Sequence, residues 1–406
     1  MIERTMYLER MRPFYDSQFV KVITGVRRCG KSVLLEQVVD DLIGRGVPSD
    51  DITYVSLEDY ANRSLLSPDA LDSYLSGRIS GRGMAYVLLD EVQLVPGFEA
   101  VVNSLQSKRN VSVFITGSNS RILSGELASL LGGRTLSFQV MPFTFAEYRR
   151  FMIECHADAV PDDRSLLQTY LTWGGMPLAC AEPTDETRAV VLDNLYSSIV
   201  LRDIIMRNSI KSPVTLECVL DYLIGNSSLT VSGNTVAAAL TDNNRKVSSP
   251  TVYDYIQAIT DSYIVSKVRR YDIQGKKALA FEKKVYACDL GFFHLRKSRV
   301  KDELGHIVET AVYNELVARG YKVYVGKTHR GEIDFIVEGD KGRCYVQAAY
   351  LLSNDDVIER EFGAYDAVKD SYPKYVVSMD PITLSRDGVR HLTLIDFLLH
   401  DDLSLS

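Results

Sequence analysis

Short apolar runs alternate with amphipathic stretches through the first third of the chain. The apolar runs predict strands at 19–24, 52–57, 85–89, 111–116 and 136–140, and the stretches with helical period predict helices at 32–43, 68–80 and 98–108. Ser67 precedes Pro68 and is the expected N-cap of the second of these helices. Strands that are apolar throughout are buried on both faces, so the alternation indicates an α/β domain with a parallel sheet covered by helices on both sides.

The hydrophobic pattern changes after residue 150. Residues 165–206 have a helical period that is interrupted at 174–177. Three helical stretches follow at 216–226, 234–241 and 250–262, and two strands come after them at 263–271 and 278–287. This is the element order of a winged helix. The last part of the chain predicts a further α/β unit. Its elements are a helix at 305–319, strands at 321–325, 331–337 and 343–349, a helix at 356–369 and a strand at 374–378. We therefore expect four parts: 1–150, 151–212, 213–300 and 301–406.

Composition limits the kinds of protein that this chain can be. A length of 406 residues is too great for one ordinary hydrophobic core, and a net charge of −7 argues against non-specific nucleic-acid binding by the whole surface. The six cysteines form no Cys-x-x-Cys pair, so we expect reduced thiols and no zinc site. Residues 1–13 carry five charged side chains and no apolar run, and no apolar run elsewhere approaches a membrane span. We expect a cytoplasmic protein without membrane contact.

Residues 25–32 have the pattern Gly-x-x-x-x-Gly-Lys-Ser between a predicted strand and a predicted helix. The glycines let backbone N–H groups surround phosphate oxygens, and the N-terminal end of the helix favours the same anion. Lys31 is expected to reach the β- and γ-phosphates of ATP, and Ser32 to hold Mg²⁺. The residues expected to bind the nucleotide are Gly25, Val26, Arg27, Arg28, Cys29, Gly30, Lys31, Ser32 and Val33.

The strand at 85–89 is followed by Asp90 and Glu91, two acids at the edge of the sheet where the phosphate loop is expected. Asp90 is expected to bind Mg²⁺, directly or through water, and Glu91 to orient and polarise the attacking water. An apolar strand that ends in an acid is common by itself, but together with the phosphate loop it indicates an ATPase. A carboxylate after the metal-binding aspartate also favours hydrolysis over phosphoryl transfer to a small molecule.

Two further catalytic candidates follow the next strand. Ser118 or Asn119 could hydrogen-bond the γ-phosphate or the attacking water, or they could form only a turn that caps the next helix. Arg134 follows two glycines and could reach the γ-phosphate of a neighbouring copy in a homo-oligomer; the alternative is an ordinary surface arginine.

These motifs resemble the AAA-type ATPases of bacteria and archaea called AAA_14, which usually carry a C-terminal region of uncertain function, DUF4143. The segments that carry the resemblance are 25–32, 89–91, 116–118, 131–134 and 142–148 in the ATPase part, and 196–203, 284–289 and 305–335 beyond it. The resemblance implies an AAA+ ATPase core (1–150), a helical lid or linker (151–212), a winged helix (213–300) and a C-terminal fold similar to restriction-endonuclease-like nucleases (301–406). It implies no known substrate.

The last part departs from the nuclease pattern. Such nucleases need an acid on a helix, an Asp on one strand and Glu-x-Lys on the next strand to bind Mg²⁺ and assist the attacking water. Glu309 and Asp334 fit the first two positions, but Gln347 and Ala349 stand where the second acid and the lysine belong. We expect a nuclease-like unit without nuclease activity, and an active Mg²⁺ nuclease is the less favoured alternative.

Basic residues concentrate in one stretch of this acidic chain. Residues 264–301 contain eleven basic residues and three acidic ones; the basic ones are Lys267, Arg269, Arg270, Lys276, Lys277, Lys283, Lys284, Arg296, Lys297, Arg299 and Lys301. Arg245 and Lys246 precede the candidate recognition helix at residue 250. This excess suggests a DNA phosphate contact, and the alternatives are a solvated hairpin or docking on an acidic neighbour. The leading hypothesis is an AAA+ ATPase switch or motor that engages DNA, and its rival is a signalling or scaffold ATPase that controls a protein partner.

Overall fold

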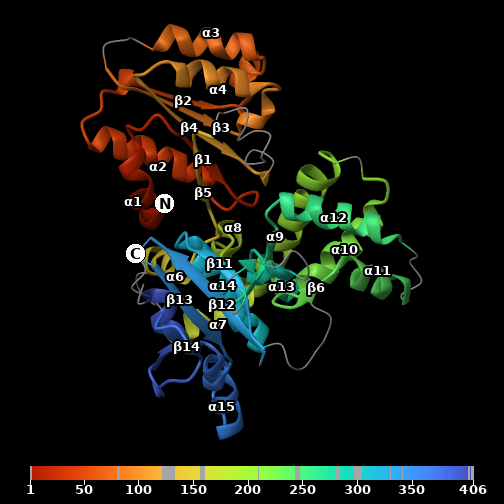
Figure 1. Ribbon diagram of the computed structural model, residues 1–406. Helices are drawn as coiled ribbons and strands as arrows, with labels where there is room; N and C mark the ends of the chain where they lie inside the picture. The colour runs from red at the N-terminus through yellow and green to blue at the C-terminus, as the bar shows by residue number, and fades with distance from the viewer. Residues whose placement is uncertain are drawn as a thin grey trace. The chain divides into compact units, whose positions relative to one another are not determined.

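The computed structural model forms two compact units, residues 1–140 with 261–263 and residues 141–260 with 264–406 (Figure 1). It describes residues 2–79, 83–120, 133–155, 161–208, 210–242, 247–273, 275, 277–278, 283–296, 304–329, 331–340, 342–400 and 403. None of the helices in this described part is both long and apolar enough to cross a lipid bilayer.

The first unit is built on a parallel sheet of five strands in the order β2-β3-β4-β1-β5. The strands are β1 (Val20–Thr24), β2 (Ile52–Ser56), β3 (Ala85–Asp90), β4 (Val111–Gly117) and β5 (Thr135–Gln139). The helices are α1 (Thr5–Met11), α2 (Lys31–Gly44), α3 (Pro68–Arg78) and α4 (Phe98–Ser107). Each predicted strand and helix of this unit is present within a few residues of its expected bounds, which confirms the α/β prediction.

Helices cover both faces of this sheet, as the largely apolar strands predict (Figure 1). Every residue of β1, β3 and β4 is buried. One apolar cluster joins α3 and α4 to one face of the sheet, through residues such as Leu71, Val102 and Val87. Ser67 caps α3 as predicted, because its side chain accepts a hydrogen bond from the backbone N–H of Ala70 at 3.3 Å. The carboxyl ends of the parallel strands, where the candidate site lies, therefore share one edge.

The second unit begins with helices and a small antiparallel sheet in the order β6-β10-β7. Its first elements are α6 (Phe145–Cys155), α7 (Asp163–Trp173), α8 (Pro177–Cys180), α9 (Asp185–Ser198) and a π-helical stretch, Ile199–Ile205. They are followed by α10 (Pro213–Gly225), β6 (Thr230–Val231), α11 (Gly233–Asp242), α12 (Ser249–Asp261), β7 (Val265–Val268), β10 (Lys283–Ala287) and α13 (Leu290–Arg296). The three helices and the two strands that the sequence predicts in this region are present, with the short strand β6 in addition.

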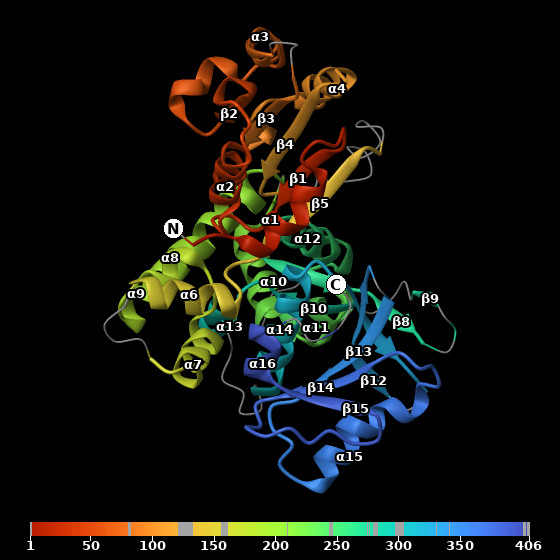
Figure 2. The same ribbon diagram turned by 90° about the vertical axis from the view of Figure 1, so that its left-hand side faces the viewer.

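A second sheet of seven strands has the order β15-β14-β13-β12-β11-β8-β9. Its strands are β8 (Arg270–Asp272), β9 (Lys277–Ala278), β11 (Lys322–Lys327), β12 (Glu332–Gly339), β13 (Gly342–Ala348), β14 (Lys374–Ser378) and β15 (Val389–Thr393). The helices are α14 (Leu304–Ala318), α15 (Asp355–Gly363) and α16 (Leu394–Leu399). Figure 2 shows α15 on one side of the strands and α14 on the other. The helices and strands predicted for residues 301–406 are therefore present, together with one unpredicted strand, β15, and the strands β8 and β9 from residues 270–278 extend the same sheet.

The prediction of one continuous strand at 263–271 is wrong. The structure divides it, because β7 pairs with β10 in the small sheet whereas β8 pairs in parallel with β11 of the large sheet. The change falls at Arg269, whose main-chain oxygen accepts a hydrogen bond from the N–H of Val325 at 3.0 Å. The basic stretch is therefore shared between two sheets.

Candidate active site

The loop between β1 and α2 requires glycine at both of its ends. Gly25 has φ +148°, and a Cβ there would lie 2.2 Å from the main-chain oxygen of Val140. Gly30 has φ +105°, in the left-handed region, directly before α2 begins at Lys31. Only glycine adopts these conformations without strain, so the sequence pattern produces a tight loop that ends at the N-terminus of a helix.

Lys31 is almost fully buried and lies over this loop. Its Nζ atom donates to the main-chain oxygens of Gly25 at 3.2 Å and Val26 at 3.1 Å. The same atom lies 4.0 Å from Oε1 of Glu91, the residue that follows β3. The loop lysine and one of the two predicted acids are thus neighbours.

The other loop residues are held from several sides. Arg27 pairs with Glu58 at 3.0 Å, and the buried Cys29 thiol donates to the main-chain oxygen of Val140 at 3.3 Å. Burial also raises the pKa of the Cys29 thiol. Arg28 is exposed, with φ +62°. These contacts fix the loop's conformation.

Asp90 and Glu91 are joined through Thr116, which ends the neighbouring strand. The Thr116 hydroxyl donates to Oδ1 of Asp90 at 2.5 Å, and the backbone N–H of Glu91 donates to the same hydroxyl at 2.8 Å. Thr116 is fully buried and Asp90 nearly so. Thr116 is not among the predicted site residues; the signal for it is a hydroxyl near the end of a mostly apolar strand.

Glu91 is held in an uncommon backbone conformation. It has φ +53°, and non-glycine residues in the left-handed region are rare and cost on the order of 1–3 kcal/mol. Its carboxylate accepts a hydrogen bond from the Gln93 amide, and its side chain is 12% exposed. Strain of this kind concentrates at functional sites, which agrees with the predicted role of Glu91.

A part of the chain that the sequence analysis did not single out braces the loop. Arg4 is buried, and its Nη1 donates to the main-chain oxygen of Cys29 at 3.0 Å. The side chain of Gln37 on α2 accepts from the backbone N–H of Arg4 at 2.8 Å and donates to the oxygen of Ile2 at 2.7 Å. No local pattern in the sequence indicates this contact.

The structure brings Ser118 to the same edge of the sheet but not Arg134. Ser118 is buried directly after β4. Arg134 is exposed and directly precedes β5, and its main-chain oxygen accepts from the N–H of Val20, the first residue of β1. The phosphate loop follows the last residue of β1, so Arg134 lies at the opposite edge and does not join the site of its own chain.

The residues at the carboxyl-terminal edge of the five-stranded sheet fit a nucleotide with bound Mg²⁺. The hydroxyl of Ser32, in the first turn of α2, and the carboxylate of Asp90 are oxygen ligands of the kind that Mg²⁺ prefers. Val33 lies in the same first turn. The glycine-bounded loop and the helix N-terminus suit the phosphate groups.

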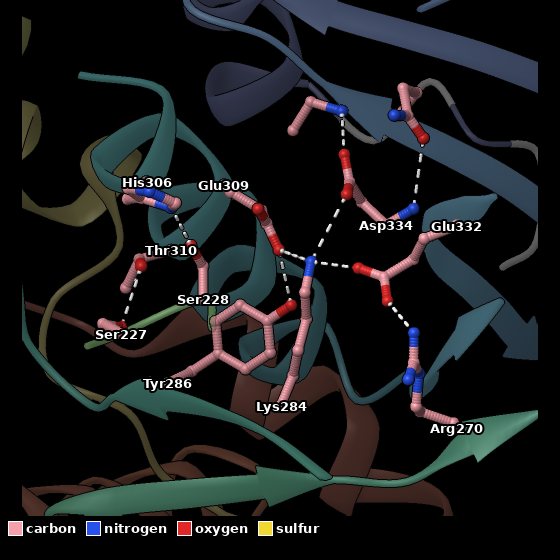
Figure 3. A network of polar contacts seen from close by, with 12 residues as sticks. Ser227, Ser228, Arg270, Lys284, Tyr286, His306, Glu309, Thr310, Glu332 and Asp334 are labelled. Atoms are coloured by element: carbon pink, nitrogen blue, oxygen red, sulfur yellow. Dashed lines mark hydrogen bonds and ion pairs between the residues drawn. The ribbon is translucent and has the colours of Figure 1, made fainter. Parts of the chain in front are cut away.

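Several cations of the basic stretch are paired with acids of the second unit. Lys284 contacts three carboxylates (Figure 3), Arg270 pairs with Glu332, and Arg296 pairs with Asp193. Six other predicted basic residues lie outside the described residues: Arg245, Lys246, Lys276, Lys297, Arg299 and Lys301. Three of the predicted basic residues are therefore held by carboxylates of their own unit.

The glycine-bounded loop, the acid pair and the five-stranded parallel sheet define an AAA-type ATPase domain. A family model described as an AAA domain matches residues 17–149. A second model, described as a domain of unknown function (DUF8612), matches residues 164–302. The expected DUF4143 region, based on residues 196–203, 284–289 and 305–335, is therefore not shown, and DUF8612 stands in its place.

Two relatives match almost the whole chain. An uncharacterized protein of Haemophilus influenzae is 32% identical over 407 residues, which cover 98% of this chain and 99% of that protein. An uncharacterized protein of Methanocaldococcus jannaschii is 27% identical over 386 residues, with 93% and 85% covered. The chain therefore belongs to the family of the Haemophilus protein, and it is an ATP-binding protein of the AAA type.

Solved structures that resemble the chain include DnaA of Aquifex aeolicus bound to AMPPCP. It is 13% identical with a TM-score of 0.31, over 62% of this chain and 85% of that one. The Orc1 protein of Aeropyrum pernix, in complex with DNA, is 13% identical with a TM-score of 0.30, over 79% and 94%.

Proposed function

We propose that this protein hydrolyses ATP with Mg²⁺ at the edge of the five-stranded sheet and that the nucleotide state controls its second unit. One observation carries the proposal: Lys31, Asp90, Glu91 and Thr116 converge beside the glycine-bounded loop. A purely structural loop would not need a buried lysine, a buried aspartate and a strained glutamate at one sheet edge.

Each residue of the site has a distinct task in this proposal. Lys31 donates to the β- and γ-phosphates, and Ser32 and Asp90 hold Mg²⁺, which neutralises phosphate charge when bound. Glu91 orients the attacking water and accepts its proton. Thr116 fixes both acids, and Ser118 hydrogen-bonds the γ-phosphate.

Arg134 acts on a neighbouring copy, so the proposal includes a homo-oligomer. Its place at the far edge of its own sheet supports this assignment, because it cannot reach the phosphates of its own chain from there. An arginine supplied by a neighbour stabilises charge on the transferred phosphoryl group.

Nucleotide binding is tested with Lys31→Ala. Loss of a charge-assisted contact worth about 1.5–3 kcal/mol should weaken ATP binding by roughly ten- to a hundredfold. Lys108→Ala is the matched control, because Lys108 follows α4 in the same unit and its side chain donates to the Ser76 hydroxyl at 3.1 Å, away from the phosphate loop. ATP affinity unchanged in Lys31→Ala, measured by calorimetry, would contradict the assignment.

The second unit is proposed to contain a winged helix that contacts DNA. The order α10-β6-α11-α12-β7-β10, with β10 between β6 and β7, supports a winged helix in part 213–300, between a helical linker (151–212) and a nuclease-like part (301–406). Helix α12 is the candidate recognition helix, and Tyr253 on it is 50% exposed. Lys267 and Arg269 follow it, and Nζ of Lys267 donates to Oε1 of Gln257 on the same helix at 2.9 Å.

A scaffold or signalling ATPase is the competing function, and a specific observation favours it. Three basic residues of the stretch are engaged with acids of their own unit, which lowers the positive charge offered to a phosphate backbone. Gel shifts on duplex and single-stranded DNA, with and without ATP, separate the two functions. With three or four phosphate contacts, affinity should fall roughly 40- to 150-fold between 50 and 200 mM salt. Absence of any shift, or a shift unchanged in Lys267→Ala/Arg269→Ala, would favour the scaffold function.

A further inference from the structure

The joint between α12 and β7 belongs to the first unit, although β7 and all but the last residue of α12 belong to the second. The joint consists of Asp261, Ser262 and Tyr263, and α12 ends at the first of these residues. All three residues are buried. A short segment next to the candidate recognition helix is therefore built into the ATPase part of the chain.

The joint contacts the ends of two strands that carry the nucleotide site. Oδ1 of Asp261 accepts from the Ser120 hydroxyl at 2.8 Å, and Ser120 lies two residues after Ser118 in the loop that follows β4. Tyr263 lies beside Thr24, the last residue of β1, which directly precedes the phosphate loop. Strands β1 and β4 are neighbours that pair in parallel. Both contacts of the joint therefore fall next to residues that are assigned to ATP.

Two hydroxyl groups are buried without a partner at this contact. Neither the Thr24 hydroxyl nor the Tyr263 hydroxyl has a hydrogen-bond partner among the residues that the structure describes. Burial raises the pKa of the Tyr263 hydroxyl to about 12, although the neighbouring Thr24 opposes this rise. A buried hydroxyl without a partner costs stability. A small shift of either residue that pairs the two hydroxyls would therefore be favourable.

The backbone of the joint is also strained. Tyr263 has φ +63°, in the left-handed region that aromatic residues rarely adopt. Strained residues persist only where their surroundings hold them, and they concentrate at ligand clamps and switches. On one side the joint is held by the hydrogen bond of Asp261, and directly after it the main-chain oxygen of Ile264 accepts from the N–H of Cys288 at 3.0 Å. Strain and unpaired hydroxyls at one place indicate an element with two accessible arrangements.

We propose that Asp261 and Tyr263 are positioning residues of the ATPase site and that the joint relays the state of the nucleotide to α12. This inference rests on the proposed function, because it requires ATP at the phosphate loop and Ser118 at the γ-phosphate. Contact with the γ-phosphate moves the ends of β1 and β4, and the Thr24 and Tyr263 hydroxyls then pair. Because the joint continues directly into α12, the helix responds to this change.

Full-length Tyr263→Phe separates this role from a purely structural one. The substitution removes only the unpaired hydroxyl, so the Tm should equal that of wild type or rise. We nevertheless expect kcat to fall roughly two- to tenfold, the loss that corresponds to one hydrogen bond, with little change in ATP affinity. Tyr74→Phe changes a partly buried tyrosine on α3 of the same unit and should keep wild-type turnover. Wild-type turnover in Tyr263→Phe would overturn the positioning role.

Asp261→Ala and Asp261→Asn test the second contact. Alanine removes the acceptor for the Ser120 hydroxyl, whereas the side-chain carbonyl of asparagine can still accept from it. Turnover should fall in Asp261→Ala and stay within about threefold of wild type in Asp261→Asn. If Asp261→Ala does not fold, Ser120→Ala removes the same hydrogen bond from the other side and should give the same loss. Equal losses in the alanine and asparagine variants, or no loss in any of them, would overturn the role of this hydrogen bond.

Hydrogen exchange tests the relay itself. Full-length Glu91→Gln is saturated with ATP and Mg²⁺, and exchange is followed in peptides of the phosphate loop and of residues 249–268. ATP should slow exchange in both regions, and adding Tyr263→Phe should abolish the slowing at 249–268 alone. A phosphate loop that responds without 249–268, or slowing at 249–268 that survives Tyr263→Phe, would overturn the relay. If calorimetry detects no ATP binding, the proposed nucleotide site is refuted, and the relay is refuted with it.

Discussion

Thr116→Val tests whether the hydroxyl between Asp90 and Glu91 positions both acids. Valine has nearly the same shape as threonine, so packing against the neighbouring strands is kept. The substitution removes the donor to Asp90 at 2.5 Å and the acceptor for the N–H of Glu91 at 2.8 Å. Thr116→Ser keeps the hydroxyl and is the matched control.

The expected losses of stability and of turnover follow from these two hydrogen bonds. A buried acceptor or donor that loses its partner costs about 1–3 kcal/mol, so losing both bonds should lower the free energy of unfolding by roughly 2–6 kcal/mol. A shift of about 1 Å in a catalytic group can reduce turnover on the order of a hundredfold. We therefore expect kcat to fall roughly 10- to 100-fold. The affinity for ATP should change little, because Lys31 and the glycine-bounded loop are untouched.

The assay measures phosphate release at saturating ATP together with ATP affinity. Thr116→Ser should retain turnover within about threefold of wild type, since its hydroxyl can make the same bonds. Wild-type turnover in Thr116→Val would refute the positioning role. Equal losses in the valine and serine variants would show that packing of the methyl group, not the hydroxyl, is what matters.

Three further predictions concern other parts of the molecule. Arg134→Ala should bind ATP normally but hydrolyse it slowly, and mixing it with Lys31→Ala should restore some activity; a fully active monomeric variant would contradict this. Wild type should not cut single-stranded or duplex DNA in Mg²⁺ or Mn²⁺, and cleavage that disappears in Asp334→Ala would show otherwise. Burial lowers the pKa of Lys21 to about 7, below its value in the unfolded chain. The unfolded chain therefore binds more protons between pH 7 and pH 10.5, and Lys21 should make stability rise with pH there by up to about 1.4 kcal/mol per unit. Denaturant unfolding should show this rise in wild type and not in Lys21→Met.

The first unit could be predicted from the sequence because its signals are local. Largely apolar strands such as Val20–Thr24 and Ala85–Asp90 indicate burial on both faces, and the glycines at 25 and 30 indicate a loop that other residues form only with strain. Parallel strands then place Asp90 and Glu91 beside that loop without further information.

Long-range partners could not be predicted in the same way. Residues 263–271 look like one strand, and only competition between two sheets decides that pairing changes at Arg269. Lys284 looks like one more surface cation, because the three acids around it come from residues 25 to 50 positions away. Arg4 likewise contacts the phosphate loop across 25 residues. Such contacts depend on tertiary packing, and they produce no periodic pattern of hydrophobic and polar residues in the sequence.

The most direct test of the central claim compares ATP hydrolysis by wild type and Glu91→Gln, with ATP binding measured in parallel. Glutamine keeps the shape and the hydrogen bonding of Glu91 but not the charge that polarises water. Wild type should release phosphate in Mg²⁺, whereas Glu91→Gln should bind ATP comparably and turn over about 10²- to 10⁴-fold more slowly. Wild type that binds ATP but releases no phosphate, or Glu91→Gln that hydrolyses ATP at the wild-type rate, would contradict the account.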